Sequence, residues 1–200
     1  MSDEPLETTG SAAATSSPRP KVIVNFFGYE PPFDPVPIVE RMVASVPPKY
    51  LIGLSQIVLT NSSGLSRKMR RSVTKARKRK VKNVEAGGLY HAAWHGNRAW
   101  IEIFVDNELR GVENRWWFKI NFIRESSLAG VVFHEIGHHI HATIHPEYRD
   151  KEDVADTWKV KLRRQYFRGR HPWIRVILYP LSPLIQLIIR FLQAKLASKK

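Results

Sequence analysis

The stretch from residue 133 to 145, FHEIGHHIHATIH, constrains this chain more than any other part of its sequence. It contains the pattern H-E-x-x-H at residues 134–138, inside a segment whose spacing predicts a helix. On a helix, positions i and i+4 lie one above the other, so His134 and His138 can point toward the same ion. Glu135 then lies to the side, close to water held by that ion. The stretch therefore predicts a metal-binding helix.

A third protein ligand must come from outside this motif, because a catalytic zinc site usually has three protein ligands and one water. The chain has no cysteine, which leaves histidine and carboxylate as ligands. The sequence offers three sources: another histidine on the same helix, a carboxylate soon downstream, or a histidine near the C-terminus. The elongated pattern H-E-x-x-H-x-x-G-x-x-H is excluded, because position 141 is histidine and position 144 is isoleucine.

Glu152 fits best among these sources. It follows a turn containing Pro146, which lets a second helix fold back beside the first. Asp156 lies four residues later on the same helical face, where its carboxylate can accept the free N–H of a liganding histidine. Asp153 is the neighbouring rival of Glu152, but no aspartate follows it at the same spacing.

The pattern HEIGHH, followed by Glu152, Ala155 and Asp156, resembles the gluzincin zinc metallopeptidases, whose signature is H-E-x-x-H and then E-x-x-x-D. It is similar to small bacterial members of the ImmA/IrrE type and to the minigluzincins, over about residues 86–160. The resemblance implies one catalytic Zn²⁺ held by His134, His138 and Glu152. It also implies that Glu135 is the general base and that Asp156 orients a ligand from behind.

The activity implied is metal-assisted hydrolysis of a peptide or protein substrate, with Glu135 taking a proton from water and passing it to the leaving amine. The resemblance also suggests that the strand around residues 98–106 pairs with an extended substrate. The protein is thus expected to be a zinc metalloendopeptidase.

Several other polar side chains are weaker candidates. His141 and His145 continue the stripe of histidines on the helix, and we expect them to be exposed or to support the ligands rather than bind metal. The candidates for an additional hydrogen-bond donor to the oxyanion are Tyr90, His91, His95, His145 and Tyr148.

The order of predicted elements, strands first and helices later, favours an α+β domain with a zincin-like arrangement: a small, mostly antiparallel sheet packed on the active-site helix and a following glutamate-bearing helix. The predicted strands are residues 21–27 and 54–61, followed by a hairpin over 86–107 that turns at His95-Gly96-Asn97. The predicted helices are residues 35–46, 126–145 and 151–167. The first follows Asp34, the second opens at Ser126 or Ser127, and the third follows Asp150.

Three regions follow from this order. Residues 1–20 form a polar tail expected to be disordered, without the apolar run of a signal peptide. Residues 21–160 form the catalytic domain, with a basic loop inserted at 65–83. Residues 161–200 form a basic and hydrophobic C-terminal segment. The expected location is the cytoplasm, with peripheral attachment to a membrane as an option.

The formal charge of +14 is concentrated in two stretches. Residues 67–82 carry ten basic residues and residues 157–200 carry eleven, with no acidic residue in either stretch. The rest of the chain is mildly acidic, which argues against a domain shaped throughout for nucleic acid. Nucleic acid binding through 67–82 is therefore not favoured over a solvated loop.

The C-terminal segment has an uncharged run of 14 residues from Val176 to Ile189. As a helix it would span roughly 21 Å, against about 30 Å for the hydrocarbon core of a bilayer. A single membrane span is not expected. The segment instead suits either an anionic membrane surface or a helix that covers the core and begins at Ser182.

An alternative function stays open at this point. The chain would then be a non-catalytic, zinc-containing binding protein whose basic segments engage nucleic acid or an anionic membrane.

Overall fold

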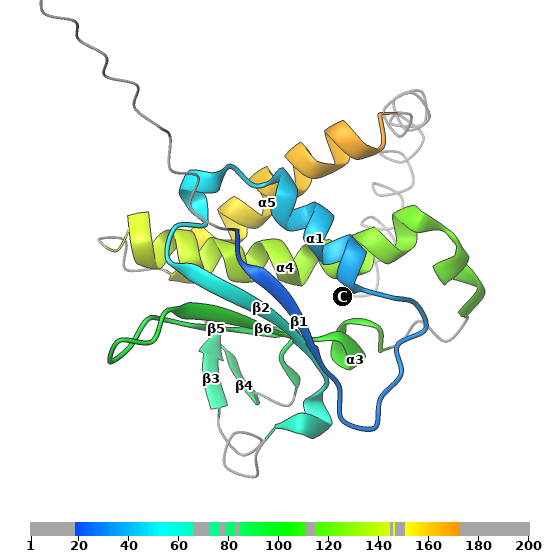
Figure 1. The fold of residues 1–200 in the computed structure, drawn as a ribbon, viewed down its shortest axis with the longest axis horizontal. Helices are drawn as coiled ribbons and strands as arrows, with labels where there is room; N and C mark the ends of the chain where they lie inside the picture. Colours follow the sequence, from blue (N-terminus) through cyan, green and yellow to red (C-terminus); the bar gives the residue numbers. More distant parts are fainter. Residues whose placement is uncertain are drawn as a thin grey trace, which may run out of the picture.

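The computed structural model of the chain describes residues 19–65, 73–76, 79–82, 85–110, 115–144, 146 and 151–172 (Figure 1). Most of the predicted tail at 1–20 lies outside these residues, as do Asp150 and the segment from residue 173 to 200.

The described residues form a mixture of strands and helices, which confirms the α+β class. The strands are β1 (Lys21–Asn25), β2 (Leu54–Thr60), β3 (Val73–Ala76), β4 (Arg79–Lys82), β5 (Gly88–His91) and β6 (Ala99–Phe104). The α-helices are α1 (Val36–Ser45), α3 (Val105–Glu108), α4 (Asn121–Ile144) and α5 (Lys151–Arg170). Short 3₁₀ helices are η1 (Pro48–Tyr50), η2 (Ser62–Gly64) and η4 (Arg115–Lys119).

The main sheet has the strand order β1-β2-β6-β5. β1 pairs with β2 and β2 with β6 in parallel, whereas β5 pairs with β6 antiparallel. The prediction of a mostly antiparallel sheet is therefore wrong. The physical reason is that α1 connects β1 to β2 as a crossover. Such a connection brings the chain back to the end of the sheet at which β1 began, so that the two strands run in the same direction.

The hairpin predicted over residues 86–107 is confirmed. Trp94 and Asn97 exchange backbone hydrogen bonds of 3.2 and 2.9 Å across the turn. The two residues between them have positive φ angles, 46° at His95 and 84° at Gly96, as a tight hairpin turn requires. This turn places β5 at the edge of the sheet, beside β6.

The N-terminal helix α1 starts close to its predicted position. Asp34 Oδ1 accepts the backbone N–H of Val36 at 3.0 Å, one residue before the N-cap position of Pro35. The buried face of α1 consists of Ile38, Val39, Met42 and Val43. This face packs on the core side of the sheet.

The prediction that the histidine-bearing helix opens at Ser126 or Ser127 is wrong, because α4 begins at Asn121. Neither serine caps the helix. Ser127 Oγ instead donates to the carbonyl of Ile123 at 2.9 Å, a bond within the helix, and Ser126 Oγ accepts a hydrogen bond from Arg163 Nη2 at 3.0 Å. The helix ends at Ile144, before Pro146, as predicted.

The core lies between the sheet and the helices. Figure 1 shows α1, α4 and α5 on one side of the sheet. Ile57 and Leu59 of β2 and Ile101 and Ile103 of β6 are fully buried on that side. They pack in one cluster with the apolar face of α4, which includes Leu128, Val132, Ile136 and Ile140.

The basic stretch predicted as a loop contains the strands β3 and β4. They pair antiparallel, with Val73 opposite Lys82 and Ala76 opposite Arg79, and form a sheet separate from the main one. Figure 1 shows this pair on the side of the main sheet away from the helices. The insertion therefore adds a hairpin outside the layer that packs on α4.

The helix α5 crosses the boundary predicted between residues 160 and 161. Leu162 and Tyr166 are 2% and 5% exposed and belong to the core. Residues 161–170 thus fold with the domain. No helix in the described part of the chain is long and apolar enough to cross a membrane.

The packing of α5 against α4 depends on a glycine inside the H-E-x-x-H motif. A Cβ atom at Gly137 would lie 2.7 Å from the carbonyl oxygen of Ala155 and 2.8 Å from its Cα. Ala155 itself is fully buried. The two helix backbones therefore approach so closely at this point that no larger residue fits without moving one of them.

We predict that Gly137→Ala lowers the free energy of unfolding by about 1–3 kcal/mol, because the methyl group forces α5 away from α4. The matched control is Gly130→Ala on the same helix, where an added Cβ meets no atom within 4 Å. That variant should be more stable by about 0.5–1 kcal/mol, since alanine favours the helix. Urea denaturation measures both changes, and equal effects of the two substitutions would contradict the packing argument.

Candidate metal centre

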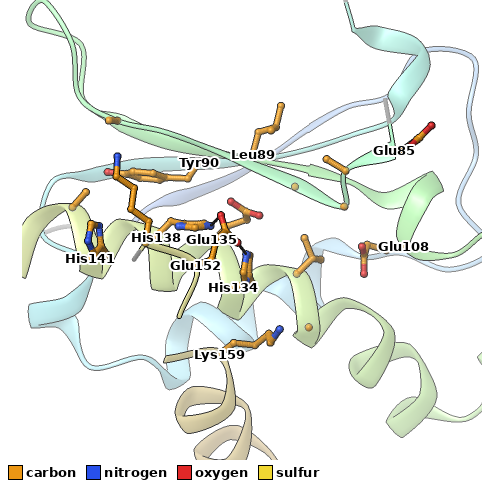
Figure 2. Close-up of a pocket in the computed structure, with 18 residues that line it drawn as sticks. Glu85, Leu89, Tyr90, Glu108, His134, Glu135, His138, His141, Glu152 and Lys159 are labelled. Carbon is orange, nitrogen blue, oxygen red and sulfur yellow. Dashed lines mark ion pairs between the residues drawn. The ribbon is translucent and has the colours of Figure 1, made fainter. Parts of the chain in front are cut away.

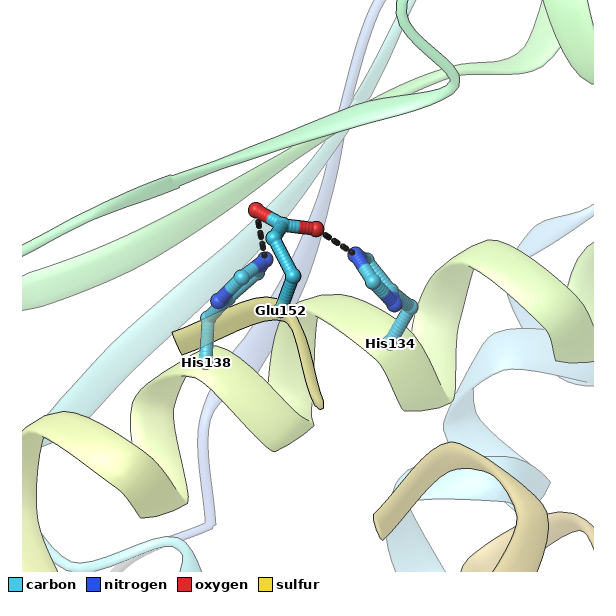
Figure 3. A group of neighbouring side chains, drawn as sticks. All are labelled: His134, His138 and Glu152. Atoms are coloured by element: carbon cyan, nitrogen blue, oxygen red, sulfur yellow. Dashed lines mark ion pairs between the residues drawn. The ribbon is translucent and has the colours of Figure 1, made fainter. Parts of the chain in front are cut away.

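The three predicted metal ligands come together in space, from two helices (Figure 3). His134 and His138 lie one turn apart on α4, and Glu152 extends from the first turn of α5. Glu152 Oε2 lies 3.6 Å from His134 Nε2, and Glu152 Oε1 lies 3.6 Å from His138 Nε2. All three ligand atoms are within 4.8 Å of one another. Among the described residues, this group can hold a metal ion.

Asp156 supports the group from behind, as the sequence predicted. Its Oδ1 lies 3.1 Å from His134 Nδ1. An aspartate in this position accepts the Nδ1–H, which leaves the lone pair of Nε2 directed toward Glu152 and a shared ion. Lys159 Nζ lies 2.6 Å from the same Asp156 oxygen and helps to fix the carboxylate.

The two candidate ligand imidazoles are neutral at physiological pH. Burial is the main cause that lowers the pKa of His134, and the nearby charge of Lys159 adds to it. Burial, followed by the neighbouring His134 and His141, lowers the pKa of His138 to about 4. Because a metal binds the neutral imidazole, both side chains are ready to act as ligands without losing a proton.

Glu135 lies next to the ligands and is only 5% exposed. Burial, followed by the negative charges of Glu152 and Glu108, raises its pKa from 4.5 to about 8. A hydrogen bond from the backbone of Tyr90 opposes this shift and ties the carboxylate to β5. A carboxyl group with a pKa close to neutrality can both accept and release a proton at physiological pH.

The ligands and Glu135 open onto a cleft of about 780 Å³ between β5 and α4 (Figure 2). The sheet side of the cleft is formed by Gly87, Gly88, Leu89 and Tyr90. A Cβ at Gly88 would lie 2.8 Å from Glu135 Cγ, so β5 approaches the motif closely only because this residue is glycine. Glu108 and Lys159 also line the cleft.

The strand expected to pair with substrate, around residues 98–106, is not available for that role. The extended part of this segment is β6, which lies between β2 and β5 and is paired on both sides. The edge of the sheet beside the cleft is β5 instead. Phe104 N–H donates to the Gly87 carbonyl at 2.8 Å. In an antiparallel pair, hydrogen-bonded residues alternate with residues whose N–H and C=O groups point outward. The backbone groups of Gly88 and Tyr90 therefore point away from β6.

The weaker candidates for an oxyanion donor do not lie together. His91 lies on the opposite face of the sheet, where its Nε2 is 3.0 Å from Glu102 Oε2 and its ring stacks on Trp100 at 3.9 Å. His95 is exposed in the hairpin turn. His145 and Tyr148 lie outside the described residues. The structure therefore does not bring His91 or His95 to the metal centre.

Tyr90 lines the cleft, but its hydroxyl group is engaged elsewhere. His139 is fully buried, with Nε2 3.0 Å from the carbonyl of Ile52 and Nδ1 3.3 Å from the Tyr90 hydroxyl. Nε2 must donate to the carbonyl, so Nδ1 accepts the hydroxyl proton of Tyr90. Tyr90 thus anchors β5 to α4 and does not direct its hydroxyl at the metal group.

The remaining histidine of the stripe, His141, is 4% exposed and lines the cleft. It is not one of the three grouped ligands, and its supporting role stays a prediction. Asp153 is exposed on α5 and is likewise not part of the group.

Three residues of the site were missed in the sequence: Gly88, Glu108 and His139. Gly88 had a signal, since glycine within a predicted strand often marks a place where another part of the chain approaches closely. Glu108 and His139 had none, because their positions depend on how α3 and the Ile52 turn pack on α4.

Comparison with protein-family models, with curated proteins and with solved structures finds no match.

We predict that Asp156→Asn weakens the affinity of the group for added metal, measured with Zn²⁺ as the probe, by about 10–100-fold, because the amide no longer provides the charge that orients His134 and raises its basicity. Asp153→Asn, one carboxylate nearer the start of the same helix, should leave the affinity unchanged. Competition with a chelating zinc indicator measures both. Equal affinities for Asp156→Asn and the wild type would contradict the assigned role of Asp156.

A second prediction concerns pH in the presence of a chelator. Because the pKa of Glu135 is raised from 4.5 to about 8 on folding, its contribution to stability is greatest below pH 4.5 and is lost as the pH rises toward 8. Glu135→Gln lacks this titration. As the pH rises from 4.5 toward 8, the melting temperature of the variant should therefore rise relative to that of the wild type. A difference independent of pH would show that Glu135 is not buried as described.

Proposed function

We propose that this protein is a zinc-dependent metallopeptidase of zincin-like fold that hydrolyses peptide bonds with Glu135 as the general base. The observation that carries the proposal is the convergence of His134, His138 and Glu152 beside a buried glutamate, in a cleft bordered by β5, the last strand in the order of the main sheet.

Zinc fits this donor set and its spacing. Two imidazoles and one carboxylate, with no thiolate, are a ligand set of catalytic zinc sites. Bonds of about 2.0–2.1 Å in tetrahedral geometry place ligand atoms about 3.4 Å apart. Glu152 lies 3.6 Å from each histidine nitrogen, so two of the three separations are already close to this value.

When bound, zinc supplies Lewis-acid chemistry, which acidifies a water molecule and polarises the carbonyl of the substrate. The chain's own residues handle the proton. Glu135 accepts it from the water and delivers it to the leaving amine. The hydrogen bond from the Tyr90 backbone holds the Glu135 carboxylate against β5.

The substrate class is inferred from the edge of the sheet. Gly88 and Tyr90 line the cleft, and the outward backbone groups of Gly88 and the outward carbonyl of Tyr90 lie on the side of β5 away from β6, whereas the Tyr90 N–H bonds to Glu135. An extended peptide can add to such an edge through main-chain hydrogen bonds. Its scissile bond would then lie between β5 and the metal ligands. This supports a peptide or protein substrate over a small molecule.

The test is Glu135→Gln in the full-length protein. The variant should keep about one zinc per chain, because Glu135 is not a ligand, and should lose hydrolysis of an unstructured protein substrate by about 10²–10⁴-fold. The matched control is Glu102→Gln, on the opposite face of the sheet beside His91, which should retain activity. Zinc is measured by atomic emission and cleavage by mass spectrometry.

Two results would contradict the proposal. A wild-type protein without zinc at neutral pH would remove the metal centre. A wild-type protein that binds zinc but shows no hydrolysis beyond that of Glu135→Gln would favour the non-catalytic zinc protein considered from the sequence.

A further inference from the structure

An exposed aromatic patch lies where η4 leads into α4, at the end of that helix away from Ile144. It consists of Trp116, Trp117 and Ile120, which are 55%, 47% and 38% exposed. The two indole rings contact each other edge to face, with centroids 5.4 Å apart. Exposure of two neighbouring tryptophans is unusual on a surface that faces only water.

The backbone beneath the patch is fixed by a buried residue. Phe118 is 5% exposed and packs against Phe33 with ring centroids 5.2 Å apart. Because Phe118 points inward, its neighbours Trp116 and Trp117 point outward. The segment is therefore amphipathic, with an anchored face and an apolar outer face.

Basic residues adjoin the patch along the chain. Residues 113–124, ENRWWFKINFIR, contain three basic residues and one acidic residue, Glu113, which lies outside the described residues. The nearest carboxylate along α4, Glu125, is fully buried and paired with Arg41, Arg170 and His171. It adds no exposed negative charge.

The end of α5 lies beside the same end of α4. The ring of Phe122 contacts those of Phe167 and His171, with centroids 5.3 and 5.5 Å apart. The second half of α5 is basic, and residues 157–172 contain no acidic residue. The chain leaves the described domain here and continues into residues 173–200, which carry five basic residues and a long apolar run.

From this juxtaposition we propose that the aromatic patch is a docking surface for an anionic lipid bilayer. Tryptophan side chains favour the level of the lipid headgroups, where an apolar ring and a polar N–H are both accommodated. Basic residues around them gain from the negative surface potential of anionic lipids. A phosphate backbone would match the charge but would not cover Ile120, so a lipid surface fits the whole patch better than a nucleic acid.

The docking surface is separate from the candidate metal centre. His134 lies fourteen residues after Ile120, which corresponds to roughly 20 Å along a helix axis. Docking at the patch therefore leaves the cleft unobstructed. Membrane binding should not depend on zinc, and it can be tested whether or not the protein is a peptidase.

The experiment measures sedimentation of the full-length protein with vesicles of phosphatidylcholine alone or mixed in equal parts with phosphatidylglycerol. We expect binding to the mixed vesicles, weakened by salt, and little binding to the neutral ones. The double variant Trp116→Ser/Trp117→Ser should bind about tenfold more weakly, since it loses both interfacial rings. The control is Trp94→Ser, which removes a tryptophan that is 73% exposed in the distant hairpin turn and should bind like the wild type.

Thermal unfolding of each variant shows whether it is folded, and a chelator should leave vesicle binding unchanged. The proposal is overturned if the folded double variant binds mixed vesicles as tightly as the wild type, as would occur if residues 173–200 alone made the contact. It is also overturned if the double variant loses binding to a single-stranded oligonucleotide but not to vesicles.

Discussion

The close contact between α4 and α5 at Gly137 is the constraint on which the candidate metal centre depends. The absence of a side chain at Gly137 lets the backbone of Ala155 approach α4 directly. Glu152 lies one turn before Ala155 and reaches the two histidines from the side. Asp156, the residue after Ala155, reaches the far nitrogen of His134. One helix crossing therefore supplies both a candidate ligand and its supporting carboxylate.

A second constraint is the way in which β5 is held over α4. Gly88 allows the strand to approach Glu135, and Tyr90 fixes it through a backbone bond to Glu135 and a hydroxyl bond to the buried His139. His139 in turn donates to the carbonyl of Ile52. The second histidine of the HH pair thus has a structural role, while its neighbour His138 faces the cleft.

Two features of the fold differ from the sequence prediction. In one, a side chain has two ways to satisfy its hydrogen bonds, and in the other the direction of a strand depends on a distant connection. Ser127 was predicted to cap a helix, but its hydroxyl group bonds to the carbonyl of Ile123 inside a longer helix. The order of strands and helices favours a mostly antiparallel sheet, but the crossover through α1 makes β1 and β2 parallel. Both errors concern partners that local sequence does not specify.

The sequence by itself determined the spacing of His134, Glu135 and His138 on one helix, because helical periodicity alone places i and i+4 on one face. It also indicated Glu152 and Asp156 as partners through the same periodicity in the next helix. Only the tertiary structure decided that these two faces meet, that burial and neighbouring carboxylates raise the pKa of Glu135, and that β5 rather than β6 borders the cleft. Those features depend on packing between segments far apart in the chain, which no local pattern encodes.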